Sequence, residues 1–225
     1  MRSIYEQALG SGFAALHPKI QERFGFSSED KRASIGTGVM EKIWHGPAYT
    51  LPFLYIGTWR RIMFPEHGQN VPFTIENYAY KDSFGRETVT WLRTFRARRE
   101  RRFDAYMVYS AERKCIVDYL GTHQHLAVDL HLSVAENGGL RLRSGEQRFY
   151  EGRIGFKFPM IFSGAADVCE WYDDEAGKFR IEVIVTNNRW GRLFGYSGSF
   201  DAEWRDIDAP METKAYRPIR EEQRE

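Results

Sequence analysis

The amino-acid sequence predicts a mainly β protein whose strands follow one another in an antiparallel meander. From Pro72 onward, apolar and polar residues alternate with the period of two that is typical of half-buried strands. Short turn segments rich in Gly, Asn and Asp separate these runs, and no helical run is long enough for repeated parallel crossovers. Because twist and exposed edges disfavour a flat, open sheet, we expect nine to ten strands to close into a calycin-like barrel or a strongly curved sheet.

The alternation after Pro72 divides into nine strand-like runs. They lie at 73–80, 87–96, 103–109, 114–120, 123–134, 140–150, 165–172, 179–187 and 196–204. Turn signals separate several of them, at 82–85, 110–113, 137–139 and 173–177. A weaker alternation over residues 33–44 predicts one further strand at the start of the sheet. Short connections of this kind make consecutive strands antiparallel neighbours.

We expect residues 1–225 to form a single β-rich domain. Residues 1–30 have near-helical apolar spacing and predict short helices, and residues 73–204 hold the sheet. Residues 49–64 are unusually apolar and aromatic, which predicts a helix that packs into the core or, alternatively, closes a cavity as a lid. The polar segment 206–225 is expected to be a frayed tail.

A helix-grip (START-like) α+β fold, in which a sheet curls around one long helix, is the alternative architecture. It ranks second because such a fold normally ends in that helix. The last forty residues of this chain instead carry strand signals and a polar tail.

The charge balance limits the classes of partner. The chain has 32 basic and 31 acidic residues and a formal charge of +1, so we expect no nucleic-acid partner. One basic run, residues 93–102, holds six arginines around a single glutamate. We expect this run to be a solvated turn between two strands, in preference to a nucleic-acid or membrane-surface contact.

The expected location is the cytoplasm. Cys115 and Cys169 lie far apart in the sequence, each within a strand-like run. We therefore expect both to be free buried thiols, which are typical of a reducing compartment. The chain starts without a cationic and apolar leader, and no apolar stretch approaches the ~20 residues of a membrane helix. We therefore expect no transmembrane segment.

The run 123–134 is the strand with the clearest division between its faces. Its even positions are almost purely aliphatic, whereas its odd positions include three histidines and an aspartate, namely His123, His125, Asp129 and His131. The preferred interpretation is a solvated polar face over an aliphatic core face. The alternatives are a polar face that lines a cavity and holds the polar head of a ligand, or a metal site made by His123, His125 and Asp129.

The turn at 137–139 pairs this strand with residues 140–150. In that pairing Asp129 is expected to lie diagonally across from Arg143, and the aliphatic row acquires Ser144, Glu146 and Arg148. A Glu and an Arg on an inward row would need a partner. The ligand-binding candidates are His123, His125, Asp129, His131, Arg143, Glu146, Arg148, Tyr78 and Trp91.

Familiar catalytic motifs are absent from the sequence. It contains no complete dinucleotide-binding loop, no phosphate-binding Gly-x-x-x-x-Gly-Lys and no Gly-x-Ser-x-Gly. Several strand carboxylates could face one another across a barrel as acid and base, but the sequence does not select a pair. They are Glu76, Asp104, Asp118, Glu146 and Asp167. Catalytic residues and cofactors therefore remain unassigned.

Three runs carry a resemblance to a known family. They are Val71-Pro-Phe-Thr-Ile-Glu-Asn-Tyr-Ala-Tyr, Asp118-Tyr-Leu-Gly-Thr-His-Gln-His-Leu and Leu142-Arg-Ser-Gly-Glu-Gln-Arg-Phe-Tyr. The chain resembles, from Ser3 to about Trp204, a bacterial family of uncharacterised domains (domain of unknown function four-one-six-six). The resemblance implies a single bacterial cytoplasmic domain, which in that family occurs alone or joined to a saccharopine-dehydrogenase-like NAD(P)-binding domain. It supplies no catalytic residue.

Together these observations predict a domain that binds a small apolar or amphipathic molecule. A role as an accessory to an oxidoreductase is one form of this hypothesis. The alternative is an enzyme that uses His123, His125, Asp129 and His131, with or without a metal, on a small organic substrate. A third hypothesis is an interaction partner of an NAD(P)-dependent reductase, for which an exposed apolar patch over 49–64 would be the sign.

Overall fold

The computed structural model describes residues 1–159, 163–207 and 216–225. Eleven strands form one antiparallel sheet. They are β1 (Arg32–His45), β2 (Gly68–Lys81), β3 (Glu87–Arg96), β4 (Glu100–Ser110), β5 (Cys115–Leu120), β6 (Leu126–Val134), β7 (Leu140–Glu151), β8 (Ile154–Lys157), β9 (Ala165–Asp173), β10 (Lys178–Asn187) and β11 (Gly191–Asp206).

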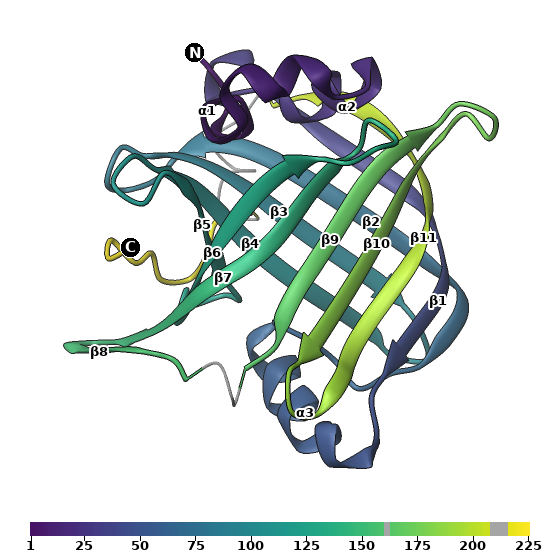
Figure 1. The fold of residues 1–225 in the computed structure, drawn as a ribbon, viewed down its shortest axis with the longest axis vertical. Helices are drawn as coiled ribbons and strands as arrows, with labels where there is room; N and C mark the ends of the chain where they lie inside the picture. The colour runs from purple at the N-terminus through teal and green to yellow at the C-terminus, as the bar shows by residue number, and fades with distance from the viewer. Residues whose placement is uncertain (160–162, 208–215) are drawn as a thin grey trace.

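The sheet closes on itself as a barrel (Figure 1). Its strand order is β6-β5-β4-β3-β2-β1-β11-β10-β9-β7-β8, and β6 also pairs with β7. Ten strands therefore form a closed ring, and β8 is an additional strand at the side of β7. The prediction of a closed antiparallel meander is confirmed. The helix-grip alternative is wrong, because the sheet encloses no long helix in the described part of the chain.

Alternation along each strand decides which side chains fill the barrel. In β10, Phe179, Ile181, Val183 and Val185 are buried, whereas the residues between them are half-buried or exposed. This is the period-two pattern of a sheet with one apolar face. Aromatic side chains also fill part of the interior. The ring centres of Phe95 and Tyr196, for example, lie 5.0 Å apart.

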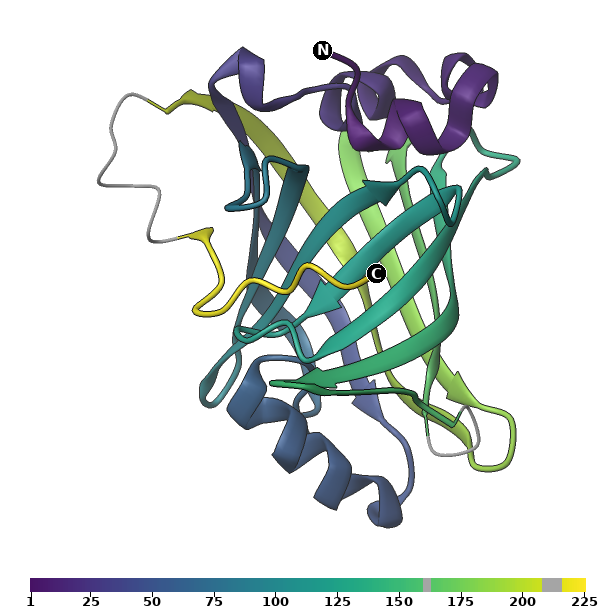
Figure 2. The same ribbon diagram turned by 90° about the vertical axis from the view of Figure 1, so that its left-hand side faces the viewer.

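Short N-terminal helices close one end of the barrel. These are α1 (Ile4–Leu9) and α2 (Pro18–Phe24), together with the 3₁₀ turns Gly10–Ala15 and Ser28–Asp30. A capping box at Ser3 and Glu6 starts α1, and Pro18 starts α2. The apolar side chains of Tyr5 and Phe24 point into the barrel and are fully buried. Figures 1 and 2 show these helices across the upper opening.

Helix α3 (Leu51–Arg60) lies at the opposite end, after the 3₁₀ turn Ala48–Thr50. The end of α3 and the residue after it are hydrogen-bonded to the barrel. Thr122 N donates to Arg60 O, and Asp104 N donates to Arg61 O at 2.9 Å. Gly121 has a φ of +75°, and a Cβ at this position would lie 2.3 Å from Arg60 O. A glycine is therefore required where α3 meets the β5–β6 turn.

The C-terminal residues 216–225 are not frayed, contrary to the sequence-based expectation. Ile219 N donates to Thr122 O, the Tyr119 hydroxyl donates to Arg224 O, and Arg86 Nη2 donates to Glu222 O. Figure 2 shows this segment running across the outer side of the barrel. Its polar composition reflects hydrogen bonding to the outer face of the sheet rather than solvation.

Two local departures from regular alternation were not predicted. Residues 121–125 form a turn, in which Gln124 has a φ of 52°, so β6 begins at Leu126 and not at residue 123. The β6–β7 register also shifts between Val128 and Leu130, which pair with Gln147 and Ser144. This bulge in β7 reverses which residues face inward beyond Ser144.

No helix in residues 1–159, 163–207 or 216–225 has the length and apolar character needed to cross a membrane.

Candidate functional site

The barrel contains an interior cavity of about 100 Å³ between β3–β7, β9 and β10. Its wall is mainly aliphatic and includes Val128 and Leu130 of β6 and Val183 and Val185 of β10. Ile62 and Met63, which follow α3, close the end of the cavity on that side. The apolar face predicted for the run 123–134 thus forms part of the cavity wall.

Arg93 of β3 is a buried cation in the wall of this cavity. It is 3% exposed, and its guanidinium lies 3.8 Å from the centre of the Phe103 ring. Arg93 Nη1 donates to the Tyr196 hydroxyl at 3.1 Å, and Nε donates to Phe103 O at 3.3 Å. None of the carboxylates in the described residues forms a direct ion pair with Arg93. A buried charge without such a partner is costly, which makes this position unusual.

Asp118 of β5 is the second polar group of the cavity. Burial raises the pKa of its carboxyl to about 7, against the opposing effects of the Arg93 charge and a hydrogen bond from the Tyr106 backbone. Its Oδ1 is buried and has no hydrogen-bond partner. Arg93 and Asp118 thus form a polar pole in an otherwise apolar space, and at neutral pH the Asp118 carboxyl is divided between its two protonation states.

Gln147 of β7 adds a neutral polar side chain to the cavity wall. It is buried because the β7 bulge turns it inward beside Ser144. Its Nε2 donates to Gly164 O at 2.7 Å, and its Oε1 accepts from the Ser163 hydroxyl. Gln147 is therefore already satisfied by the segment before β9, which leaves Asp118 as the cavity group with a free acceptor.

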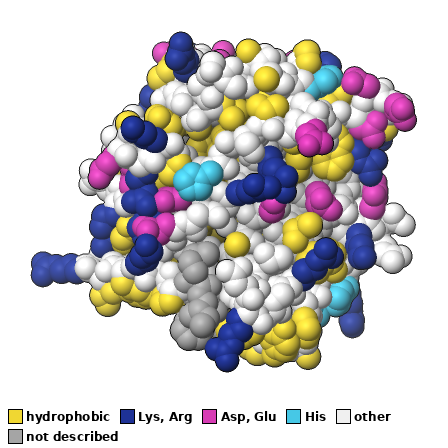
Figure 3. Space-filling view, viewed as in Figure 1, with side chains coloured by type: hydrophobic (Ala, Val, Ile, Leu, Met, Phe, Trp, Pro, Cys, Tyr) yellow, Lys and Arg dark blue, Asp and Glu magenta, His cyan; other side chains and the backbone are white. Residues whose placement is uncertain are grey.

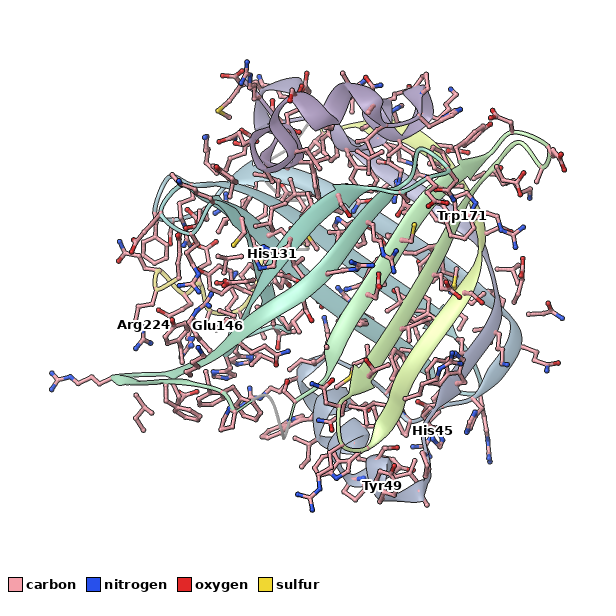
Figure 4. The ribbon with its side chains drawn as sticks, in the orientation of Figure 1. His45, Tyr49, His131, Glu146, Trp171 and Arg224 are labelled. Atoms are coloured by element: carbon pink, nitrogen blue, oxygen red, sulfur yellow. The ribbon has the colours of Figure 1, made fainter. Side chains whose placement is uncertain are left out.

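The predicted polar face lies on the outside of the barrel, where Asp129 is the centre of an ion-pair network. Asp129 accepts from Arg113 Nη2 and from Arg148 Nη2, each at 2.6 Å, and Glu146 accepts from both arginines. Burial tends to raise the pKa of Asp129, but the hydrogen bonds from Arg113 and Arg148 outweigh it, so the pKa lies below its usual value. Figure 4 shows His131 and Glu146 on this side of the barrel.

Arg143 lies opposite His131 and therefore diagonally across from Asp129, as predicted, although its ion pair is with Asp167. A second predicted detail of this face is wrong. Glu146 and Arg148 are not on the inward row, because the bulge in β7 turns them outward toward Asp129.

The histidines of the predicted site are spread over a turn and a strand. His123 and His125 stack in the β5–β6 turn, with ring centres 5.4 Å apart, and His125 Nδ1 lies 2.8 Å from Glu151 Oε2. His131 is exposed on β6. Within residues 1–159, 163–207 and 216–225, no three His, Cys, Asp or Glu side chains come together as a metal-binding group. The geometry therefore gives no support to a metal site at His123, His125 and Asp129.

The two aromatic candidates occupy different places. Trp91 lines the cavity, and its Nε1 donates to the Tyr5 hydroxyl at 2.7 Å. Tyr78 lies outside and stacks on Tyr216, with ring centres 4.3 Å apart. Of the predicted ligand-binding residues, only Trp91 is thus part of the interior cavity, whereas Arg93 and Asp118 were not among them.

Replacing Asp129 with alanine is expected to lower the free energy of unfolding by about 2 kcal/mol, because two arginines lose their shared acceptor. Binding of a small ligand in the cavity should be unchanged, since Asp129 faces outward. Urea unfolding together with a ligand titration separates the two effects. Loss of binding without loss of stability would instead assign Asp129 to a ligand site.

Comparison with known proteins identifies the family. A family model described as a domain of unknown function (DUF4166) matches residues 16–200. The uncharacterized protein YndH of Bacillus subtilis (strain 168) is 33% identical over 207 residues, which cover 92% of this chain and 100% of that protein. No solved structure matches the chain. The chain therefore belongs to the DUF4166 family.

Proposed function

We propose that this protein binds a small apolar or amphipathic molecule inside its barrel. The observation that carries the proposal is the buried Asp118 Oδ1, which has no partner in a cavity whose walls are otherwise mainly aliphatic. Buried polar atoms in folded proteins are nearly always paired, and an unpaired one in a cavity is an anchor for a ligand. Arg93 beside the same space supplies a permanent positive charge.

The cavity volume limits the size of the ligand. About 100 Å³ accommodates a single ring or a short chain. Met63 and Met107 are part of the wall, and their flexible side chains are those that can adapt to a larger apolar group. The ligand would place its apolar part against Val128 and Val185 and its polar group at Arg93 and Asp118.

The polar pole favours a ligand with a hydrogen-bond acceptor. Arg93 donates at every physiological pH, and the protonated Asp118 carboxyl adds a second donor. A ligand carboxylate would therefore bind more tightly as the pH falls through about 7, the pKa of Asp118. A ligand amine would show the opposite trend, because it needs the ionised Asp118.

Ligand occupancy can be tested by filling the cavity. Val128→Phe places a ring inside the cavity, whereas Val39→Phe makes the same change at a position on β1 that is 39% exposed. Benzoate, benzyl alcohol and benzylamine are suitable probes, because they share one ring and differ in the polar group. We expect Val128→Phe to weaken benzoate binding at least about tenfold and Val39→Phe to leave it unchanged.

Titration by ligand-observed NMR at pH 6 and pH 8 measures both the affinities and their pH dependence. Native mass spectrometry of the purified protein adds the mass of any molecule that copurifies. Equal binding by the two phenylalanine variants would refute the interior site. Binding to the wild type that is independent of the polar group would refute the role of Arg93 and Asp118.

A further inference from the structure

Helix α3 is apolar on both of its sides. Leu54 and Gly57 face the barrel and are buried, whereas Tyr55, Ile56 and Trp59 are 61%, 66% and 77% exposed. Among the described residues, ten large apolar side chains are exposed, and four of them lie between Tyr49 and Trp59. A helix that is apolar all round is normally covered on all sides. The outer face of α3 is therefore a surface without a partner in the monomer.

The surface around this helix is strongly basic. The chain has no acidic residue between Glu41 and Glu66. The segments next to the end of α3 and at neighbouring strand turns, residues 60–66, 96–104 and 189–192, contain nine arginines and three carboxylates. Figure 3 shows apolar side chains gathered at the lower end of the molecule, with Lys and Arg side chains beside them.

The three carboxylates are already neutralised by part of this set. Glu66 pairs with Arg101, Glu100 pairs with Arg96, and Asp104 pairs with both Arg61 and Arg102. Five exposed or half-exposed cations remain with no carboxylate partner among the described residues. They are Arg60, Arg98, Arg99, Arg189 and Arg192. Arg60 lies over the Trp59 ring, with its guanidinium carbon 4.5 Å from the ring centre, so charge and apolar surface are contiguous.

We infer that the α3 end of the barrel docks on the surface of an anionic lipid bilayer. An exposed apolar helix face with Trp and Tyr, surrounded by arginines, matches the interface between acyl chains and anionic headgroups. The helix has only ten residues and so lies in the interface without crossing it. This inference goes beyond the proposed ligand binding and is independent of what occupies the cavity.

The arrangement of charge favours a bilayer over a second copy of the chain. A symmetric dimer through α3 would place the same patch on both subunits, so each basic rim would face another basic rim. A nucleic acid would satisfy the arginines but would leave Tyr55, Ile56 and Trp59 in water. An anionic membrane satisfies both parts of the surface at once. Only residues 97–99 of the run 93–102 form the expected solvated turn, because residues 93–96 belong to β3 and residues 100–102 to β4, and Arg93 is buried. Arg98 and Arg99 of this turn are part of the basic surface beside α3.

Vesicle flotation with the full-length protein tests this inference. We expect binding to vesicles of phosphatidylglycerol and phosphatidylcholine at 50 mM salt, much weaker binding to phosphatidylcholine alone, and release at 500 mM salt. Trp59→Ala should lower the partition coefficient at least about tenfold. Arg98→Gln with Arg99→Gln should lower it about thirtyfold, at about 1 kcal/mol for each charge.

Matched controls lie at the other end of the barrel. Phe84→Ala removes an exposed ring from the β2–β3 turn, and Lys19→Gln with Lys178→Gln removes two positive charges near α2. These variants should bind vesicles as the wild type does, and all variants should keep the wild-type unfolding midpoint because the changed side chains are exposed.

Three results would overturn the inference. One is failure of the wild type to float with anionic vesicles, and another is equal binding by the Trp59→Ala variant. The third is a concentration-dependent dimer in sedimentation velocity that Trp59→Ala abolishes, because this would assign the patch to a second copy of the chain.

Discussion

Asp118→Asn is expected to raise the free energy of unfolding by up to about 4 kcal/mol at pH 8 and to change it little below pH 4. The Asp118 carboxyl titrates near 3.8 when unfolded and near 7 when buried in the barrel. Between these values the folded protein holds a proton that the unfolded chain has released. The stability of the wild type therefore falls as the pH rises from about 4 to about 7, and asparagine removes that loss.

Urea unfolding at pH values from 4 to 8 measures this difference, and NMR titration of the Asp118 carboxyl carbon gives its midpoint directly. A matched control is Asp201→Asn on β11, which changes an exposed carboxylate and should show no such pH dependence. If Asp118→Asn were instead destabilising at pH 8, the ionised carboxylate would be supporting Arg93, and the pKa of Asp118 would lie below its usual value.

Arg23→Met is expected to lower the free energy of unfolding by about 4 kcal/mol at pH 7. Arg23 joins α2 to the barrel: its guanidinium forms an ion pair with Glu170 of β9 and donates to Ser34 Oγ at 2.6 Å and Asn77 Oδ1 at 2.8 Å. Both charged side chains are almost completely buried. Loss of the arginine leaves Glu170, whose pKa burial already raises, without its cation.

The double variant Arg23→Met with Glu170→Leu separates the charge from the packing. It should recover most of the lost stability, because a buried ion pair replaced by apolar groups of similar size is close to neutral in free energy. Lys19→Met on the same helix removes only an exposed pair with Glu22 and should change stability by less than about 0.5 kcal/mol. A double variant as unstable as the single one would show that the hydrogen bonds to Ser34 and Asn77 dominate instead.

The fold was predictable because alternation and short turns are local properties of the sequence. The weak pattern over residues 33–44 does correspond to β1, which occupies Arg32–His45. Strand β8 was missed because it has only four residues, which are too few to establish an alternating pattern. The turn at residues 121–125 was assigned to a strand because its histidines continue the apparent alternation of β6. Nothing in the residue types reveals the positive φ of Gln124.

The candidate site was much less predictable than the fold. Asp118 was one of five strand carboxylates that the sequence could not rank, although it occupies the apolar row of Ile116 and Leu120. That single acidic residue on an apolar row was the available signal. Arg93 was grouped with a basic run, and only the structure separates this buried side chain from the exposed Arg98 and Arg99. Which charge is buried depends on closure of the barrel, which no local pattern describes.

The outward placement of Glu146 and Arg148 has a similar explanation. A bulge of β7 opposite Asp129 reverses the alternation, and a period-two argument fails from that point onward. Gly145 is the local trace of this bulge, because a Cβ there would lie 2.9 Å from the His131 ring. A glycine within a strand-like run is a known sign of such an irregularity.

The seam between β1 and β11 has a consequence for the kinetics of folding. Arg32 pairs with Asp206 and His45 pairs with Phe194, so the first strand of the ring is flanked by the last. Nearly the whole barrel sequence must therefore be synthesised before the ring can close. Until then β1 has only β2 as a neighbour, and its other edge remains open to pairing with another nascent chain. Contacts between such distant parts of the chain also slow folding, so closure of this seam is the expected rate-limiting event.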